Sequence, residues 1–160
     1  MTAKPKTAFV TGASNGFGTA IVRRFAADGM RVVALARRED RLQSLAAELG
    51  DRVLPLPLDV RDRAAVGAVA TGLPAAFAGI DVRVTSVEPG MAGQTGFSTV
   101  RFGGDQAQAD AVYAGTQPLS PADIAEAVSW VVAQPAHVNV RVVELMPVAQ
   151  SFAPFQVYRS

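Results

Sequence analysis

Cysteine is absent from this 160-residue sequence, histidine occurs once, and lysine occurs only as Lys4 and Lys6. Without cysteine the chain can form no disulfide, use no thiol nucleophile and hold no thiolate-bound zinc, and a reducing compartment is compatible with it. The one histidine, His137, lies in Pro-Ala-His-Val-Asn, where nothing suggests a Ser-His-Asp hydrolase. We therefore expect His137 to be a loop residue, and we expect no metal site.

The sequence also lacks an excess of charge and any long apolar run. Its 15 Lys and Arg residues stand against 14 Asp and Glu residues, for a formal net charge of +1. This balance gives no electrostatic reason to expect nucleic acid or an anionic membrane as a partner. No apolar run approaches the roughly 20 residues that span a bilayer, and MTAKPKTAFV leads into a predicted strand rather than resembling a signal peptide. A cytoplasmic protein is expected.

What the sequence does contain is typical of a globular α/β protein. Apolar residues make up 49% and charged residues 18%, and the length suits one domain over residues 1–160. Short apolar runs typical of strands alternate with segments of helical periodicity, which favours an α/β fold with a parallel sheet and right-handed crossovers. The predicted strands are 7–11, 31–36, 53–58, 79–90 and 140–146, and the predicted helices are 16–27, 39–49, 62–77, a turn near 105–113, and one beginning after Ser120.

Several local signals refine these elements. Pro55 and Pro57 cannot donate ladder hydrogen bonds, so their strand should lie at a sheet edge. Ser120-Pro121-Ala122-Asp123 is a strong helix start, and Trp130 in that helix should pack into the core. Residues 91–119 form a long polar loop, and such a loop in a compact domain is usually functional.

A glycine-rich turn, TGASNGFG, connects the first strand to the first helix. Gly12 can allow the tight turn, Gly16 can let the backbone approach a diphosphate, and Gly18 can let the helix approach the sheet. The exposed N–H groups and the helix dipole would then hold the anion. The alternative is a glycine-rich turn with no ligand.

The end of the second strand bears on which dinucleotide would bind. An acidic residue there would bind the ribose hydroxyls of NAD, but the strand ends Ala36-Arg37-Arg38, about 20 residues past the glycine turn. Two guanidiniums can bind a 2′-phosphate, which favours NADP(H); otherwise they are solvated arginines at a helix start. Asp59 and Val60, after the third strand, can flank the adenine, or Asp59 can cap the following turn.

As a set, TGASNGFG, ALARREDRL, LPLDV, VRVTSVEPG and LMPVAQSFAPFQV resemble the short-chain dehydrogenase/reductase family, most closely its NADP-dependent 3-hydroxy acid dehydrogenases. The resemblance implies a Rossmann fold, NADP as cofactor and a loop that closes over substrate. It assigns cofactor contacts to Gly12, Ala13, Ser14, Asn15, Gly16, Phe17, Gly18, Arg37, Arg38, Asp59, Val60, Pro89, Gly90, Thr95 and Phe97.

The resemblance also implies that a central segment is missing. In the family, GIDV begins strand four and VRVTSVEPG is strand six, so the sequence resembles two strands joined near Val82 and Arg83. The family's catalytic serine and Tyr-xxx-Lys pair lie between them. Tyr113 and Tyr158 are the only tyrosines here, neither has lysine four residues on, and no catalytic residue is assigned. We expect a deletion variant with a smaller doubly wound sheet of about five strands in the order 3-2-1-(4/6)-7.

The joined strand and the missing helices raise two further expectations. Arg83 would share a face with Thr85 on an interior strand, so it must reach the sheet margin or the strand fits poorly. The lost helices should expose apolar sheet surface, which favours a homo-oligomer, through that surface or the C-terminal tail, or a weakly stable monomer.

The sequence is compatible with three functions. The first is an NADP(H)-binding module with no hydride transfer. The second is a working NADP-dependent oxidoreductase that uses another proton donor on a small 3-hydroxy acid. The third is a scaffold or interaction subunit that binds no cofactor.

Overall fold

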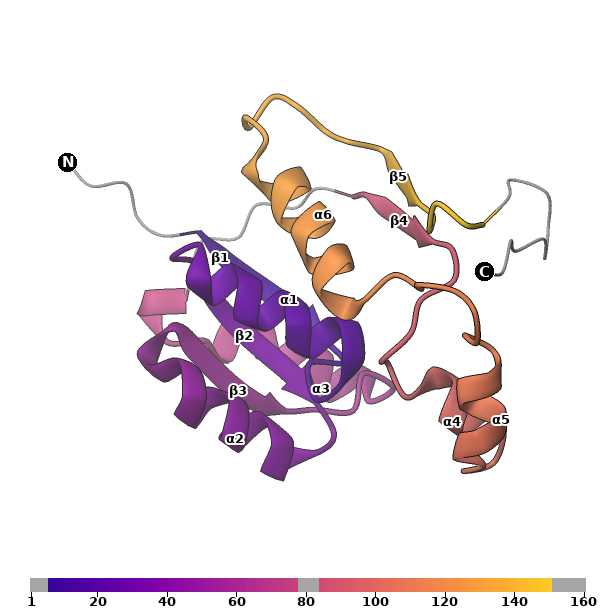
Figure 1. Cartoon of the computed structure of the whole chain (residues 1–160). Helices are drawn as coiled ribbons and strands as arrows, with labels where there is room; N and C mark the ends of the chain where they lie inside the picture. Colours follow the sequence, from indigo (N-terminus) through magenta and orange to yellow (C-terminus); the bar gives the residue numbers. More distant parts are fainter. Residues whose placement is uncertain (1–5, 78–83, 151–160) are drawn as a thin grey trace. The chain divides into compact units, whose positions relative to one another are not determined.

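The chain divides into two compact units, unit 1 within residues 1–82 and unit 2 within residues 83–160. The computed structural model (Figure 1) describes residues 6–77 and 84–150. The boundary coincides with the join expected near Val82 and Arg83, although these two residues lie outside the described ones, as does the tail 151–160. That residues 1–160 form a single domain stays a prediction.

Unit 1 alternates strands and helices in the predicted order (Figure 1). The first four elements begin and end at the residues predicted from the apolar pattern. The elements are β1 (Thr7–Thr11), α1 (Gly16–Ala27), β2 (Arg31–Ala36), α2 (Glu39–Leu49), a 3-10 turn η1 (Gly50–Arg52), β3 (Val53–Pro57), α3 (Arg63–Gly72) and a second 3-10 turn η2 (Ala75–Phe77).

The three strands of unit 1 form a parallel sheet with β2 in the middle. The 3-2-1 part of the predicted order is therefore confirmed. β3 lies at the edge, as its prolines predicted, and Pro55 and Pro57 pair in register with Ala34 and Ala36 of β2.

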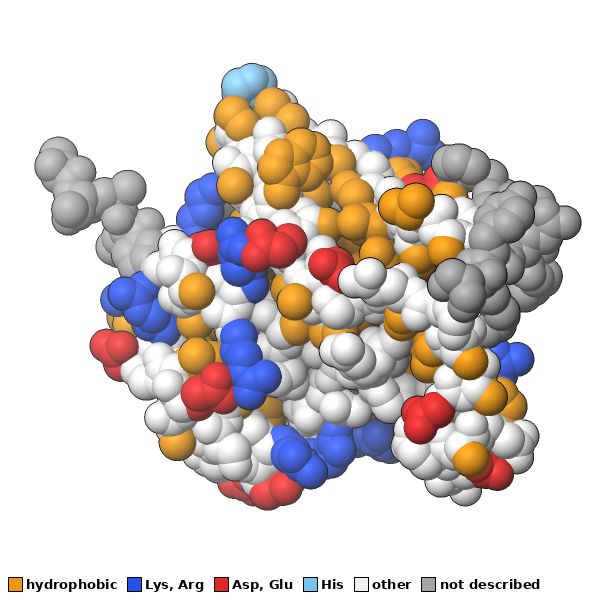
Figure 2. Space-filling model, viewed as in Figure 1, with side chains coloured by type: hydrophobic (Ala, Val, Ile, Leu, Met, Phe, Trp, Pro, Cys, Tyr) orange, Lys and Arg blue, Asp and Glu red, His pale blue; other side chains and the backbone are white. Residues whose placement is uncertain are grey.

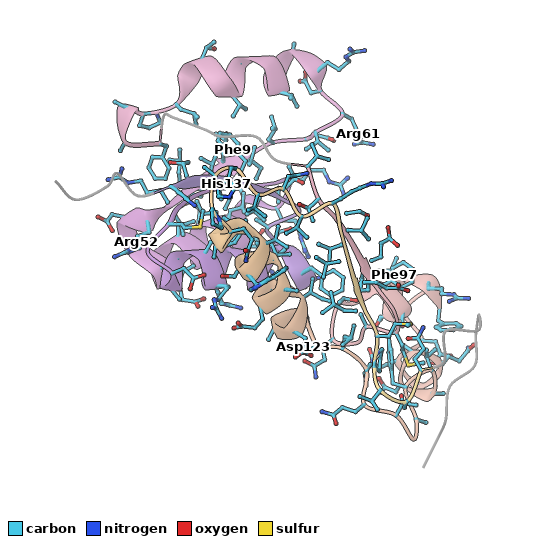
Figure 3. The ribbon with its side chains drawn as sticks, turned by 90° about the horizontal axis from the view of Figure 1, so that it is seen from above. Phe9, Arg52, Arg61, Phe97, Asp123 and His137 are labelled. Carbon is cyan, nitrogen blue, oxygen red and sulfur yellow. The ribbon has the colours of Figure 1, made fainter. Side chains whose placement is uncertain are left out.

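Helices cover both faces of this sheet, α1 and α2 on one side and α3 on the other (Figures 1 and 3). Successive side chains of β2 point to opposite faces, and both sets are buried. Val33 and Leu35 pack with Phe77 in one core cluster, while Val32 and Ala34 are fully buried. This is the doubly wound arrangement, in which ligand sites form beyond the carboxyl ends of the strands.

The third helix is shorter than the predicted range 62–77. α3 ends at Gly72, and Leu73 is extended at φ −71° and ψ 140°. Pro74 explains this end, because a proline disfavours helical backbone at the residue before it. Asp62 caps the start, accepting hydrogen bonds from the N–H groups of Ala64 and Ala65 at 3.0 Å.

Unit 2 contains a second, two-stranded parallel sheet formed by β4 and β5. The pairing of the joined strand with the last strand is confirmed, but both strands are shorter than predicted in the described residues. The elements are β4 (Ser86–Pro89), α4 (Phe97–Arg101), α5 (Gln106–Ala111), α6 (Pro121–Ala133) and β5 (Val142–Leu145).

The described strands pair within each unit, β1 to β3 in one sheet and β4 with β5 in the other. The pairing of β1 with β4 that one five-stranded sheet requires stays a prediction. The side chains of β4 and β5 are more polar than those of a typical interior strand. Ser86 and Glu88 on β4 and Glu144 on β5 are exposed at alternate positions, whereas an interior parallel strand is buried on both faces. Thr85 is held by a hydrogen bond from its Oγ1 to the carbonyl oxygen of Val140 at 2.6 Å, while Arg83 lies outside the described residues.

The loop 91–119 is more ordered than the sequence predicted. α5 was expected as one helical turn, but α4 was not expected. α4 begins after Gly96, whose φ of 75° is a left-handed conformation that glycine favours. Its few helical positions give too little periodicity to predict.

α6 begins as predicted, but Trp130 is not in the core. Ser120 and Asp123 form a reciprocal capping box with proline at the start. Trp130 is 56% exposed, because it lies on the opposite side of the helix from the stripe that buries Ile124 and Val131. Figure 2 shows hydrophobic side chains gathered over α6 on the side of the molecule that faces the viewer. His137 lies in an exposed turn, as predicted.

Among residues 6–77 and 84–150, none of the helices has both the length and the apolar character that crossing a membrane requires.

Candidate functional site

The glycine-rich turn lies between the carboxyl end of β1 and the start of α1. Gly12 has a φ of 68° and Gly16 a φ of 52°, both left-handed conformations that glycine adopts readily. The turn predicted from the glycine spacing is therefore present, with Ala13 fully buried beneath it and Ser14 and Asn15 completing it before the helix.

Gly18 lets the first turn of α1 approach this loop closely. A Cβ atom at Gly18 would overlap the carbonyl oxygen of Gly12 and lie 2.6 Å from its carbonyl carbon. The loop is also anchored by hydrogen bonds. Ala13 N donates to Leu35 O at 3.1 Å, and Thr19 Oγ1 donates to Ala13 O at 2.8 Å. The backbone of this turn is thus fixed to β2 and to α1.

The start of α1 has the properties of an anion site. The Asn15 side chain makes no hydrogen bond to the first helical turn, and this turn, which includes Phe17, contains no acidic residue. N–H groups at a helix start carry partial positive charge and favour an anion. A diphosphate fits this donor set, and the close approach at Gly18 is the feature such a cradle requires.

Arg38 connects the glycine turn to the end of β2. Its Nη2 donates to the carbonyl oxygen of Ser14 at 3.0 Å and to Ser14 Oγ at 3.2 Å, and its Nε donates to Ser14 Oγ at 3.2 Å. The neighbouring Arg37 is exposed and, in the part of the chain that the structure describes, makes no hydrogen bond or ion pair. The two predicted anion-binding segments therefore lie side by side.

Asp59, after β3, pairs with Arg61. Arg61 Nη2 donates to Asp59 Oδ2 at 2.5 Å, and Arg61 Nε lies 3.0 Å from both carboxylate oxygens. The side-chain and backbone hydrogen bonds from Arg61 lower the pKa of Asp59 from 3.8 to about 2, and the charge of Arg37 also lowers it.

Asp59 also caps the turn that follows β3, which confirms one of its two expected roles. Its Oδ1 accepts a hydrogen bond from Arg61 N, and its carbonyl oxygen accepts from Asp62 N, each at 3.0 Å. Val60 between them is 57% exposed, so its side chain is open to a ligand. The contact of Asp59 and Val60 with adenine stays a prediction.

The remaining predicted residues lie in unit 2. Gly90 N donates to Leu145 O at 2.7 Å, and a Cβ atom at Gly90 would overlap the Gln150 side chain. Gln150 Oε1 accepts from Met91 N at 2.7 Å, which fixes the backbone after Pro89.

Thr95 and Phe97 form the second group of predicted cofactor contacts in unit 2, and they lie together at the start of α4. Thr95 Oγ1 accepts from Phe97 N at 3.3 Å, and Phe97 is 68% exposed (Figure 3). The assignment of Pro89, Gly90, Thr95 and Phe97 to a cofactor stays a prediction.

A pair of hydroxyl groups in unit 2 was not predicted. Tyr113 OH donates to Ala92 O at 3.0 Å and lies 2.6 Å from Ser98 Oγ. Because the single hydroxyl proton of Tyr113 goes to Ala92, Ser98 donates to Tyr113. Gln117, rather than lysine, stands four residues after Tyr113, so this pair holds the loop and does not reproduce a Tyr-xxx-Lys arrangement.

The contacts of Arg61 and Gln150 were also missed by sequence reasoning. Arg61 is two residues from Asp59, a spacing that gives no sign from the sequence alone that the side chains pair in a turn. Gln150 is 59 residues from Met91, and nothing local in the sequence signals such a contact.

Unit 1, with its parallel sheet and glycine-rich strand-to-helix turn, is of the Rossmann class. Residues 6–102 match the short chain dehydrogenase family, and the chain belongs to that family. It is 34% identical to the NADP-dependent 3-hydroxy acid dehydrogenase YdfG of Salmonella typhi, over 94% of this chain and 98% of that protein. It is 30% identical to the serine 3-dehydrogenase of Agrobacterium fabrum, over 96% of this chain and 98% of that protein.

A solved structure supports the same relationship. The closed form of a serine dehydrogenase complexed with NADP+ is 31% identical, with a TM-score of 0.87, over 96% of this chain and 100% of that one. The alignment with the Salmonella protein extends over 244 positions, whereas this chain has 160 residues. The alignment therefore includes positions at which that relative has a residue and this chain has none.

Proposed function

We propose that this chain is an NADP(H)-binding member of the short chain dehydrogenase family that does not transfer hydride. The observation that carries the proposal is the pairing of Arg38 with Ser14, which unites the glycine turn and the arginine pair in one cationic site. The relatives named NADP-dependent, and the relative solved with NADP+, support this cofactor.

Each part of unit 1 would hold one part of the cofactor. The N–H groups of residues 12–18 would bind the diphosphate, and Arg37 and Arg38 the 2′-phosphate through charge-assisted hydrogen bonds. Asp59 and Val60 would flank the adenine. Bound NADP+ supplies a hydride acceptor at its nicotinamide ring.

The absence of a proton-transfer group argues against turnover. Reduction or oxidation at a hydroxyl-bearing carbon needs an acid or base at the substrate oxygen. The sequence contains no tyrosine with a lysine four residues later, and lysine occurs only at positions 4 and 6. The unmatched part of the relatives and the unit boundary after Val82 support a deletion at the join.

A binding comparison tests the choice of cofactor. Arg37→Ala combined with Arg38→Ala should weaken NADPH binding about tenfold to a hundredfold, since a hydrogen bond to a charged group contributes roughly 1.5–3 kcal/mol. NADH binding should change little. Arg41→Ala with Arg63→Ala removes the same charge elsewhere and should leave both affinities unchanged. Equal losses for NADPH and NADH in the first variant would refute the cofactor choice.

A turnover assay separates the three functions. With NADP+ and serine or 3-hydroxypropionate, we expect no NADPH formation above the protein-free rate. Steady formation would establish instead a working oxidoreductase on 3-hydroxy acids. If a fluorescence titration gave no saturable NADPH signal, the scaffold or interaction function would be the one of the three that remains.

A further inference from the structure

Arg61 satisfies most of the hydrogen-bonding capacity of Asp59. Its guanidinium contacts both carboxylate oxygens, and its backbone N–H donates to one of them. Asp59 is one-third exposed, so its carboxylate would be accessible to another cation if Arg61 were absent. Arg61 is well exposed and lies in the turn between β3 and α3 (Figure 3).

Arg37 and Asp59 follow the ends of neighbouring strands, because Leu58 N, after β3, donates to Ala36 O at the end of β2 at 2.9 Å. The Arg37 charge contributes to the lowered pKa of Asp59, yet the two side chains form no ion pair in the described residues. Arg37 is thus left unpaired beside an acid that is already occupied. Without Arg61, we expect the freed carboxylate to pair with Arg37.

We propose that Arg61 is a positioning residue for cofactor specificity, which holds Asp59 so that the Arg37 guanidinium stays available to a 2′-phosphate. This inference rests on the proposed NADP(H) binding. Two effects of the Arg61 charge act in the same direction. It prevents Asp59 from pairing with Arg37, and it neutralises a carboxylate that would repel the phosphate.

The ratio of NADPH affinity to NADH affinity tests the proposal, because it cancels effects on the shared adenosine and diphosphate. Arg61→Ala should lower this ratio about tenfold, the effect of losing one hydrogen bond to a charged group. Adding Asp59→Asn to Arg61→Ala should restore it, since no carboxylate remains to capture Arg37. Arg63→Ala, which removes an exposed charge two residues away, should leave the ratio unchanged.

The outcomes separate this inference from the proposed function. If the unmodified chain binds neither nucleotide, both fall. If it prefers NADPH, and Arg61→Ala matches Arg63→Ala or Asp59→Asn fails to restore the preference, the role of Arg61 alone is overturned.

A titration without cofactor provides a second readout. By NMR, the Asp59 pKa in Arg61→Ala should stay below 3.8, the ordinary aspartate value, because Arg37 takes over the carboxylate. It should return to that value when Arg37→Ala is added. An ordinary Asp59 pKa in Arg61→Ala alone would contradict the capture of Arg37, and matching amide spectra would show that the variants remain folded.

Discussion

At the scale of single residues, Gly18 illustrates how closely the first helix approaches the turn before it. The carbonyl group of Gly12 occupies the space that any Cβ atom at this position would need. Gly67, in the middle of α3, has open space around its Cα atom. Only Gly18 is required by a close contact, so substitution by alanine should change the free energy of unfolding in opposite directions at the two positions.

Gly18→Ala should lower the free energy of unfolding by about 1–3 kcal/mol, because the turn or the helix must shift to admit the methyl group. Gly67→Ala should raise it by about 0.4–1 kcal/mol, because alanine restricts the unfolded chain and fits a helix. Urea denaturation monitored by circular dichroism measures both changes. A Gly18→Ala protein as stable as the Gly67→Ala protein would contradict the close approach.

The local structure of the candidate site was predictable where the residues are close in sequence. The glycine turn and the arginine pair each lie within a few consecutive residues, so spacing alone indicated them. The contacts of Arg61 with Asp59 and of Gln150 with Met91 depend on how turns and distant segments fold. Propensities of single residues contain no such information.

At the scale of elements, α6 shows how a helix start can be specified by its own sequence. Ser120 Oγ accepts from Asp123 N at 3.2 Å, and Asp123 Oδ2 accepts from Ser120 N at 2.8 Å. Ser120→Ala should lower the free energy of unfolding by about 1 kcal/mol through the lost cap. Thermal unfolding against Ser44→Ala, a mid-helix control in α2, measures this, and equal stability of the two variants would contradict it.

Two capping carboxylates should make stability depend on pH. Backbone hydrogen bonds from Gln108 and Ser120, with side-chain hydrogen bonds from the same residues, lower the pKa values of Asp105 and Asp123 respectively from 3.8. A lowered folded-state pKa contributes stability that is present above 3.8 and is lost as the pH falls through the folded value. The free energy of unfolding should therefore fall on acidification below this value.

Asp105→Asn with Asp123→Asn should make that acid dependence shallower, which denaturant titrations over a pH series would measure. If the free energy of unfolding of this variant depended on pH as steeply as that of the unmodified chain, Asp105 and Asp123 would not be the source of the acid dependence.

Element boundaries were predictable where apolar periodicity and punctuating residues agree, as from β1 through α2. Element boundaries were not predictable where contacts with distant parts of the chain decide where a helix or strand ends. α4 has too few residues for a period, and Pro74 ended α3 before its apolar pattern did. Trp130 is exposed although a large aromatic residue favours the core, because its angular position on α6 lies away from the buried stripe.

At the scale of the whole molecule, the chain is a family member whose unit 1 has a more extensive described sheet than its unit 2. Unit 1 has a buried central strand and helices on both faces of its sheet, whereas the described sheet of unit 2 has only two strands. A two-stranded sheet is marginal on its own. The single five-stranded sheet stays a prediction, and it requires the joined strand to lie in the interior of the sheet despite the exposed Ser86 and Glu88.

Exposed apolar side chains in unit 2 favour self-association. Val84, Trp130 and Val142 are 77%, 56% and 46% exposed. We expect sedimentation velocity to show concentration-dependent association, or thermal unfolding to show weak cooperativity, and Trp130→Gln to reduce the association. Val66→Gln, a change at an exposed valine of unit 1, is the control. A monodisperse, cooperatively unfolding monomer would contradict this expectation.

The most direct test of the central claim is an NMR titration of the whole 16.7 kDa chain with NADP+, followed through its backbone amides. Signals of Gly12, Gly16, Gly18, Arg37 and Arg38 should shift together and saturate at one nucleotide per chain. Saturation that leaves these amides unshifted, or an absence of any saturable change, would contradict it.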